Sequence, residues 1–182
     1  MHARARDESG FGLIELLMAM VMLNVGILAV VAAFSSGNRA LARASQISTA
    51  AALADKQLEV YRGLIYDNIV FVTSEWNAAL ADSSYTADTA YTSNMQSPVS
   101  PKGLVATVST CPTSVPTSAC DPSSTVIGAD HRSYRVDTYL YYDAPGGGSQ
   151  LKTVTVVVRS SSNTGTSFAR ATSTFDSSTN PS

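Results

Sequence analysis

The stretch Gly10-Phe11-Gly12-Leu13-Ile14-Glu15 opens a long apolar run that decides the fold of this chain. The run continues from Leu16 to Phe34 without an ionisable side chain, which is long enough for a helix to cross a bilayer. One carboxylate, Glu15, lies a turn inside the apolar segment, where a charge costs about 2.5–3.5 kcal/mol to insert. We therefore expect a transmembrane helix over residues 11–36 in which Glu15 has a function.

A short polar leader, residues 1–10, precedes this run. It lacks the apolar core of a conventional secretory signal, and the long apolar segment follows it directly. Charge does not set the orientation of the helix, because Arg39 and Arg43 after the run balance Arg4 and Arg6 before it.

The leader, the Gly-Phe junction and the apolar run resemble the processing signature of type IV prepilins and type II secretion pseudopilins. That signature reads Gly-Phe-(Thr/Ser)-Leu-Ile-Glu before a long apolar segment, and this chain departs from it only at Gly12. The resemblance implies that a prepilin peptidase cuts between Gly10 and Phe11 and that Phe11 becomes N-methylated. It also implies that the leader lies on the cytoplasmic side of the inner membrane and the remainder outside.

Glu15 has two interpretations. In an assembling subunit, Glu15 neutralises the free α-amine of a neighbouring subunit's Phe11 and sets the axial register between the two helices. In a plain anchor, Glu15 extends to the interface from near the helix end. The first interpretation is favoured, because an isolated anchor does not require Gly-Phe at its start.

Small residues recur at seven-residue spacing along the run, at Gly12, Ala19, Gly26 and Ala33. Such a stripe lets helices approach closely in a membrane, although Ala and Gly are also frequent in membrane helices in general. No proline interrupts residues 29–34, so we expect an unkinked helix, which suits a minor pilin at least as well as a major one.

Residues 37–66 keep a helical period but become amphipathic, which predicts a second helical half that packs on a globular head. Its apolar stripe is spaced by threes and fours: Ala40, Ala44, Ile47, Ala51, Ala54, Leu58, Tyr61 and Ile65. The segment from Leu53 to Arg62 also resembles the corresponding part of PilV-type minor pilins.

The head is expected over residues 67–182. Residues 66–101 are rich in Ser, Thr and Asp, which predicts a long loop with a short helix at 74–81; it either forms a contact surface or covers a sheet edge. Strands are predicted at 104–108, 134–142, 151–158 and 168–175, of which the middle two form an antiparallel hairpin. The expected class is α+β: a long N-terminal helix packed on a small antiparallel sheet, as in pilins.

Few residues suggest chemistry. Cys111 and Cys120 form an even pair in a Pro/Ser/Thr-rich segment of an exported chain, which favours a disulfide over a metal site. His131 is the single histidine after the leader, and we expect it in a surface loop. The residues indicate no enzyme, metal or cofactor, and the net charge of −2 gives no reason to expect nucleic acid as a partner.

The sequence thus predicts a structural minor pilin or pseudopilin that polymerises with other such subunits through its N-terminal helix. Its expected partners are these subunits, the prepilin peptidase and the inner membrane, and after assembly it lies in a pilus or pseudopilus. The alternative is a single-pass, membrane-anchored binding module outside the cytoplasm that does not polymerise.

Overall fold

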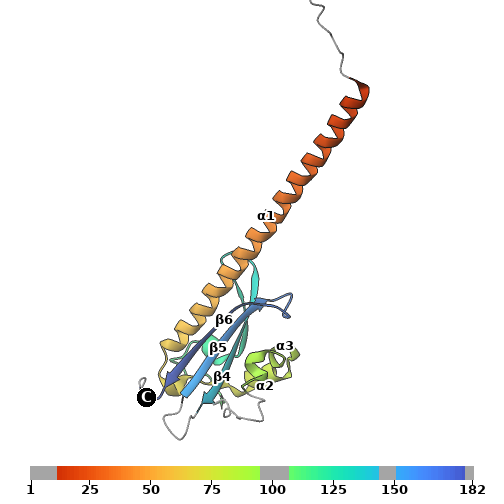
Figure 1. Cartoon of the computed structure of the whole chain (residues 1–182). Helices are drawn as coiled ribbons and strands as arrows, with labels where there is room; N and C mark the ends of the chain where they lie inside the picture. The colour runs from red at the N-terminus through yellow and green to blue at the C-terminus, as the bar shows by residue number, and fades with distance from the viewer. Residues whose placement is uncertain (1–11, 95–106, 144–150, 179–182) are drawn as a thin grey trace, which may run out of the picture. The chain divides into compact units, whose positions relative to one another are not determined.

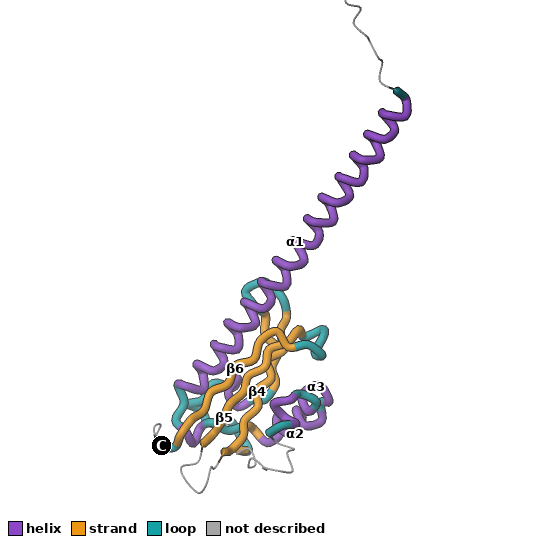
Figure 2. Tube along the Cα trace, in the orientation of Figure 1, coloured by secondary structure: helices purple, strands orange, loops and turns teal. Residues whose placement is uncertain are grey.

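The computed structural model describes residues 12–94, 107–143 and 151–178, which form an α+β protein (Figures 1 and 2). The chain divides into two compact units, with the boundary after Ala44. The predicted class, a long N-terminal helix with a small antiparallel sheet, is confirmed. Processing residues Gly10 and Phe11 lie outside the described residues.

The N-terminal unit consists of the first part of helix α1, Leu13–Arg62. Its large apolar side chains are exposed, from Leu13 (81%) to Phe34 (69%). Among the described residues, α1 is the one helix long and apolar enough to cross a membrane.

The C-terminal part of α1 belongs to the head, and its buried stripe differs in part from the predicted one. Ala54, Leu58 and Tyr61 are buried as expected. Ala50 is buried where the pattern predicted Ala51, and the predicted Ile47 (43%) and Ile65 (41%) are exposed. Alanine side chains are small, so an alanine-rich helix can turn either of two neighbouring alanines toward the core. The spacing of its apolar residues therefore predicts the buried face only to within one residue.

Helix α1 ends at Arg62, about one turn before the predicted end at residue 66. Gly63 follows, a residue type that commonly stops helices. Its amide donates to the carbonyl of Glu59 (3.1 Å), and the Leu64 amide donates to the carbonyl of Tyr61 (3.1 Å). Tyr66, expected in the helix, lies instead in the short 3-10 helix η1, Tyr66–Asn68.

The main sheet has four antiparallel strands in the order β3-β4-β5-β6. Their bounds are β3 Ser123–Ile127, β4 Ser133–Asp143, β5 Leu151–Ser160 and β6 Ser167–Asp176. Figure 1 shows β4, β5 and β6 side by side. The predicted hairpin is therefore confirmed, with Val136 opposite Val158 and Leu140 opposite Val154.

Alternate residues of the sheet enter two different cores, as the strand period of two requires. Val136, Leu140 and Val154 pack with Leu58 and Tyr61 of α1. The opposite face carries a smaller cluster of Ala79, Tyr85, Ala90, Tyr139 and Val157. The sheet is thus covered by the C-terminal part of α1 on one face and by short helices on the other.

Those short helices correct the expectation of a long loop over residues 66–101. The predicted short helix is present as α2, Thr73–Ala81, and is followed by α3, Ser83–Thr86, and α4, Thr89–Thr92. The Asp82 side chain accepts from the Ser84 amide (2.8 Å), and that of Asp88 accepts from the Ala90 amide (2.7 Å). Two of the Asp residues that suggested a loop, Asp82 and Asp88, therefore cap helices.

The described part of the predicted strand at 104–108 belongs to a different sheet from the one expected. Of its residues the structure describes Thr107–Val108, strand β2, which pairs in parallel with β1, Phe71–Val72, in a separate small sheet. A short helix, α5, Thr117–Cys120, then leads to β3, the edge strand that the sequence analysis missed. The strand has five residues, none of them fully buried, which gives a weak sequence pattern, so the pairing with β4 identifies it.

Candidate functional site

The start of α1 holds the candidate assembly residues. Gly12 precedes the helix, and its carbonyl accepts from the amides of Glu15 (2.9 Å) and Leu16 (3.2 Å). Glu15 lies in the first turn and is exposed, a position where a carboxylate favours the helix dipole. The carboxylate is therefore presented outward from the beginning of an apolar helix.

The small residues predicted for helix packing are all exposed: Gly12, Ala19, Gly26 and Ala33. A Cβ atom added at Gly12 or Gly26 would meet nothing within 4 Å. A shallow apolar notch surrounds Gly26 and is lined by Met22, Leu23, Ile27, Val30 and Val31. Side chains seven apart lie on nearly the same side of a helix, so these small residues form one stripe with room beside it.

Cys111 and Cys120 are joined by a disulfide, the pairing that the sequence predicts, with their Cα atoms 5.8 Å apart. Cys120 belongs to the main core. Two side chains of α1 bind the neighbouring backbone: Gln57 Nε2 donates to the Ser118 carbonyl (2.7 Å) and the Tyr61 hydroxyl to the Ala119 carbonyl (2.8 Å). The disulfide loop is therefore held against α1.

We expect no free thiol in the unreduced, denatured, exported protein and two after reduction, as measured by thiol labelling. Changing Cys111 and Cys120 together to serine should lower the melting temperature of the head by about 5–10 °C, because the closed loop contributes about 2.7 kcal/mol. Two labelled thiols without reduction would refute the bond in the exported protein.

A network of charged side chains, which we call the ionic clamp, lies on the sheet face opposite α1. Its members come from the N-terminal caps of α3 and α4 and from strands β4, β5 and β6: Asp82, Asp88, Arg135, Asp137, Arg159 and Arg170. The clamp therefore ties two short helices to three strands.

Asp137 is the most deeply buried member, with a fully covered side chain. Its Oδ1 accepts from Ser123 Oγ (2.7 Å) and from Arg135 Nε (2.7 Å). Its Oδ2 accepts no hydrogen bond among the described residues but lies 3.7 Å from Arg159 Nη1.

Arg135 Nη1 continues the network by donating to Asp82 Oδ2 (2.5 Å). Burial alone would raise the pKa of Asp82, but the hydrogen bond from Arg135 and others hold it below its ordinary value.

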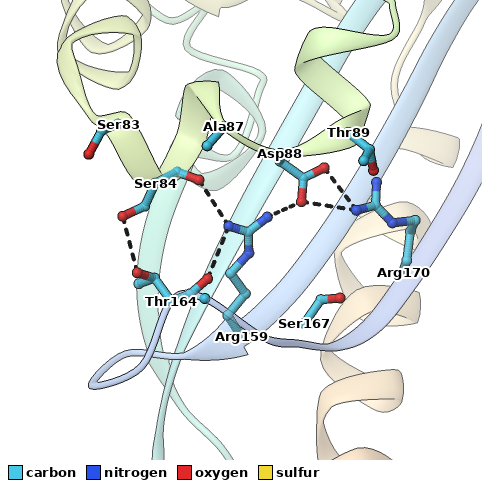
Figure 3. A pocket seen from close by; sticks show the side chains of 10 residues that line it. Ser83, Ser84, Ala87, Asp88, Thr89, Arg159, Thr164, Ser167 and Arg170 are labelled. Atoms are coloured by element: carbon cyan, nitrogen blue, oxygen red, sulfur yellow. Dashed lines mark hydrogen bonds and ion pairs between the residues drawn. The ribbon is translucent and has the colours of Figure 1, made fainter.

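Asp88 is shared by two arginines. It pairs with Nη2 of Arg159, whose side chain is 4% exposed, and both its oxygens accept from Arg170 Nη2 (2.8 and 2.9 Å). Arg159 Nη1 also donates to the carbonyls of Ser84 (3.0 Å) and Thr164 (3.4 Å). Figure 3 shows Arg159 and Arg170 pointing toward Asp88 from opposite sides.

A tyrosine pair lies beside the clamp. The rings of Tyr85 and Tyr139 stack with centroids 4.4 Å apart. Tyr85 donates to the Thr138 carbonyl (2.6 Å), and Tyr139 donates to the Tyr85 carbonyl (3.0 Å). Burial raises the pKa of both hydroxyls, with added contributions from charged and ring neighbours that include Asp137. Both tyrosines therefore remain neutral donors that fasten α3 to the sheet.

The clamp was missed at the level of sequence, although part of its signal is visible there. Arg135 and Asp137 alternate with apolar residues in β4, and Arg159 ends a run of valines in β5. A charge inside a strand usually faces solvent, so the pattern does not reveal that helices cover this face.

His131 lies exposed in the turn between β3 and β4, at φ 58°.

No cluster of three or more His, Cys, Asp or Glu side chains suited to a metal ion occurs in the part of the chain that the structure describes. Comparison of the chain with protein-family models, curated proteins and solved structures gave no match.

Proposed function

We propose that this chain is a structural subunit, a minor pilin or pseudopilin of a type IV pilus or type II secretion-like filament. Prepilin peptidase cuts it between Gly10 and Phe11, and Phe11 is methylated. The chain then crosses the inner membrane once, with its head outside the cytoplasm, and joins a filament through α1.

The surface of the first part of α1 carries this proposal. From Leu13 to Phe34 every side chain is exposed, and Glu15 and Asn24 are the only polar ones. A continuous apolar surface of this size requires lipid or other apolar helices around it. A membrane supplies the first environment before assembly, and the helices of neighbouring subunits supply the second within a filament.

Glu15 gives the assembly its register. A buried carboxylate in either environment needs a partner of opposite charge, and the α-amine of a processed Phe11 is such a group. A neighbouring subunit displaced along the filament axis brings its Glu15 to that amine. The exposed small residues spaced by seven, Gly12, Ala19, Gly26 and Ala33, allow the helices to approach closely.

We expect mass spectrometry of the membrane-extracted protein to show a chain that begins at Phe11 and carries an N-methyl group. Gly10→Leu should leave the leader attached, because the peptidase needs backbone access at that position, whereas Gly10→Ala should be cut slowly or normally. Cells without the peptidase provide the control, in which Met1 is retained. An intact Met1 terminus in cells with an active peptidase would refute the prepilin assignment.

A further inference from the structure

We propose that the head binds a saccharide that carries one carboxylate, a uronate, in the open pocket beside the ionic clamp. The pocket lies between α3, α4, the β5–β6 connection and the start of β6 (Figure 3). Its volume is about 560 Å³, within the range of small-molecule sites. Nothing in the proposed assembly through α1 uses this pocket.

The position of Arg170 in the pocket favours an anionic group of a ligand. Arg159 and Arg170 line the pocket together with one carboxylate, that of Asp88. Asp137 also lies against Arg159 (3.7 Å), so the clamp as a whole is balanced, with three carboxylates and three guanidinium groups. Its alternating charges end in the pocket on Arg170, whose one carboxylate partner, Asp88, is shared with Arg159. An anionic group of a ligand is attracted to this positive end.

The donor for the ligand is Arg170. Its Nη2 is occupied by Asp88, but Nε and Nη1 have no hydrogen-bond partner among the described residues. The side chain is 36% exposed, so these groups are accessible. Arg159 is held by Asp88, Asp137 and two carbonyls, so it forms part of the wall of the pocket and is not the donor to the ligand.

Hydroxyl groups surround the arginine. The side chains of Ser83, Thr89 and Ser167 are exposed in the pocket, and their hydroxyls make no hydrogen bond to other described residues. The hydroxyls of Ser84 and Thr164 bond to each other (3.1 Å). Hydroxyls both donate and accept, which matches the hydroxyls of a sugar. No large apolar side chain lines the pocket, so a hydrated polar ligand fits it better than an apolar one.

Ligand-observed NMR on the full chain in detergent micelles tests this proposal with galacturonate, galactose and inorganic phosphate as probes. We expect galacturonate to bind at least about tenfold more tightly than galactose, because galacturonate alone has a carboxylate that accepts a charged hydrogen bond from Arg170, and such a bond contributes a difference of that size. Phosphate should bind more weakly than galacturonate. A galacturonate trimer that binds as tightly as the monomer identifies a polymer as the source, and a trimer that fails to bind identifies the free sugar.

Arg170→Gln should weaken galacturonate binding at least about tenfold and leave galactose binding almost unchanged. The fold should persist, because Asp88 keeps Arg159 and the Ala90 amide as partners. Thr89→Val should weaken both sugars by about threefold through the loss of one hydroxyl. Arg132→Gln is the matched control, an exposed arginine outside the pocket, and should change neither affinity.

Three outcomes would overturn the proposal: equal binding of galacturonate and galactose, tighter binding of phosphate than of galacturonate, or full galacturonate binding by a folded Arg170→Gln variant.

Discussion

Glu15→Leu is expected to leave the chain in the membrane and to remove it from filaments. The substitution makes the start of α1 fully apolar, so membrane residence is kept or improved. In a filament the same change leaves the neighbour's Phe11 amine as an unpaired charge in a poorly solvated place, which costs about 3 kcal/mol or more. The ratio of protein in the sheared filament fraction to protein held in the membrane should therefore fall by about 100-fold.

Two further variants make this measurement specific. Glu15→Lys should assemble less well than Glu15→Leu, because two positive charges would then meet. Glu59→Leu is the matched control: Glu59 is an exposed residue of the head part of α1 that pairs with Arg62, and loss of an exposed pair costs at most about 1 kcal/mol. An unchanged ratio for Glu15→Leu, with wild type in filaments, would remove Glu15 from the mechanism. Wild type absent from filaments would favour the plain membrane anchor.

Asp137→Asn is expected to destabilise the head strongly. The substitution keeps the size of the side chain but removes the buried negative charge beside Arg135 and Arg159. Arg159, which is 4% exposed, then keeps Asp88 as its one carboxylate partner, and it shares that carboxylate with Arg170. Removing one partner from a buried ionic network costs about 3–5 kcal/mol, so the melting temperature should fall by about 10 °C or more.

The single tryptophan reports this transition. Trp76 stacks on Phe71 (5.7 Å between centroids) and meets the edge of Tyr85 (6.1 Å), so its fluorescence follows unfolding of the head in detergent-solubilised full chain. Asp55→Asn, on the exposed face of α1, is the matched control and should change the free energy of unfolding by less than about 0.5 kcal/mol. A melting temperature of Asp137→Asn equal to that of the control would show that the charge of Asp137 is not required.

The local sequence determined the parts of this protein whose signals are long or strongly periodic. An apolar run without charges predicts a membrane-length helix, and it does so without reference to any other part of the chain. The β-branched residues of β4 and β5 predicted their hairpin, because strand propensity and the turn-rich residues between the strands agree. The even count of cysteines and the Pro/Ser/Thr-rich segment around Cys111 and Cys120 favoured a disulfide, and the structure contains the bond.

The tertiary structure alone decided which faces are covered and which polar residues are buried. Asp82 and Asp88 belong to a segment that resembles a loop, and they become helix caps and charge partners only where β4, β5 and β6 supply arginines. Burial of a charge depends on partners that are far away in sequence, since its desolvation cost is offset only when the opposite charge lies within a few ångströms. For the same reason, the sequence around Arg159 does not predict that it pairs with Asp88, and the sequence around Asp88 does not predict Arg159 as its partner. Helix periodicity is local, whereas the ionic clamp and the pocket beside it exist only in the folded head.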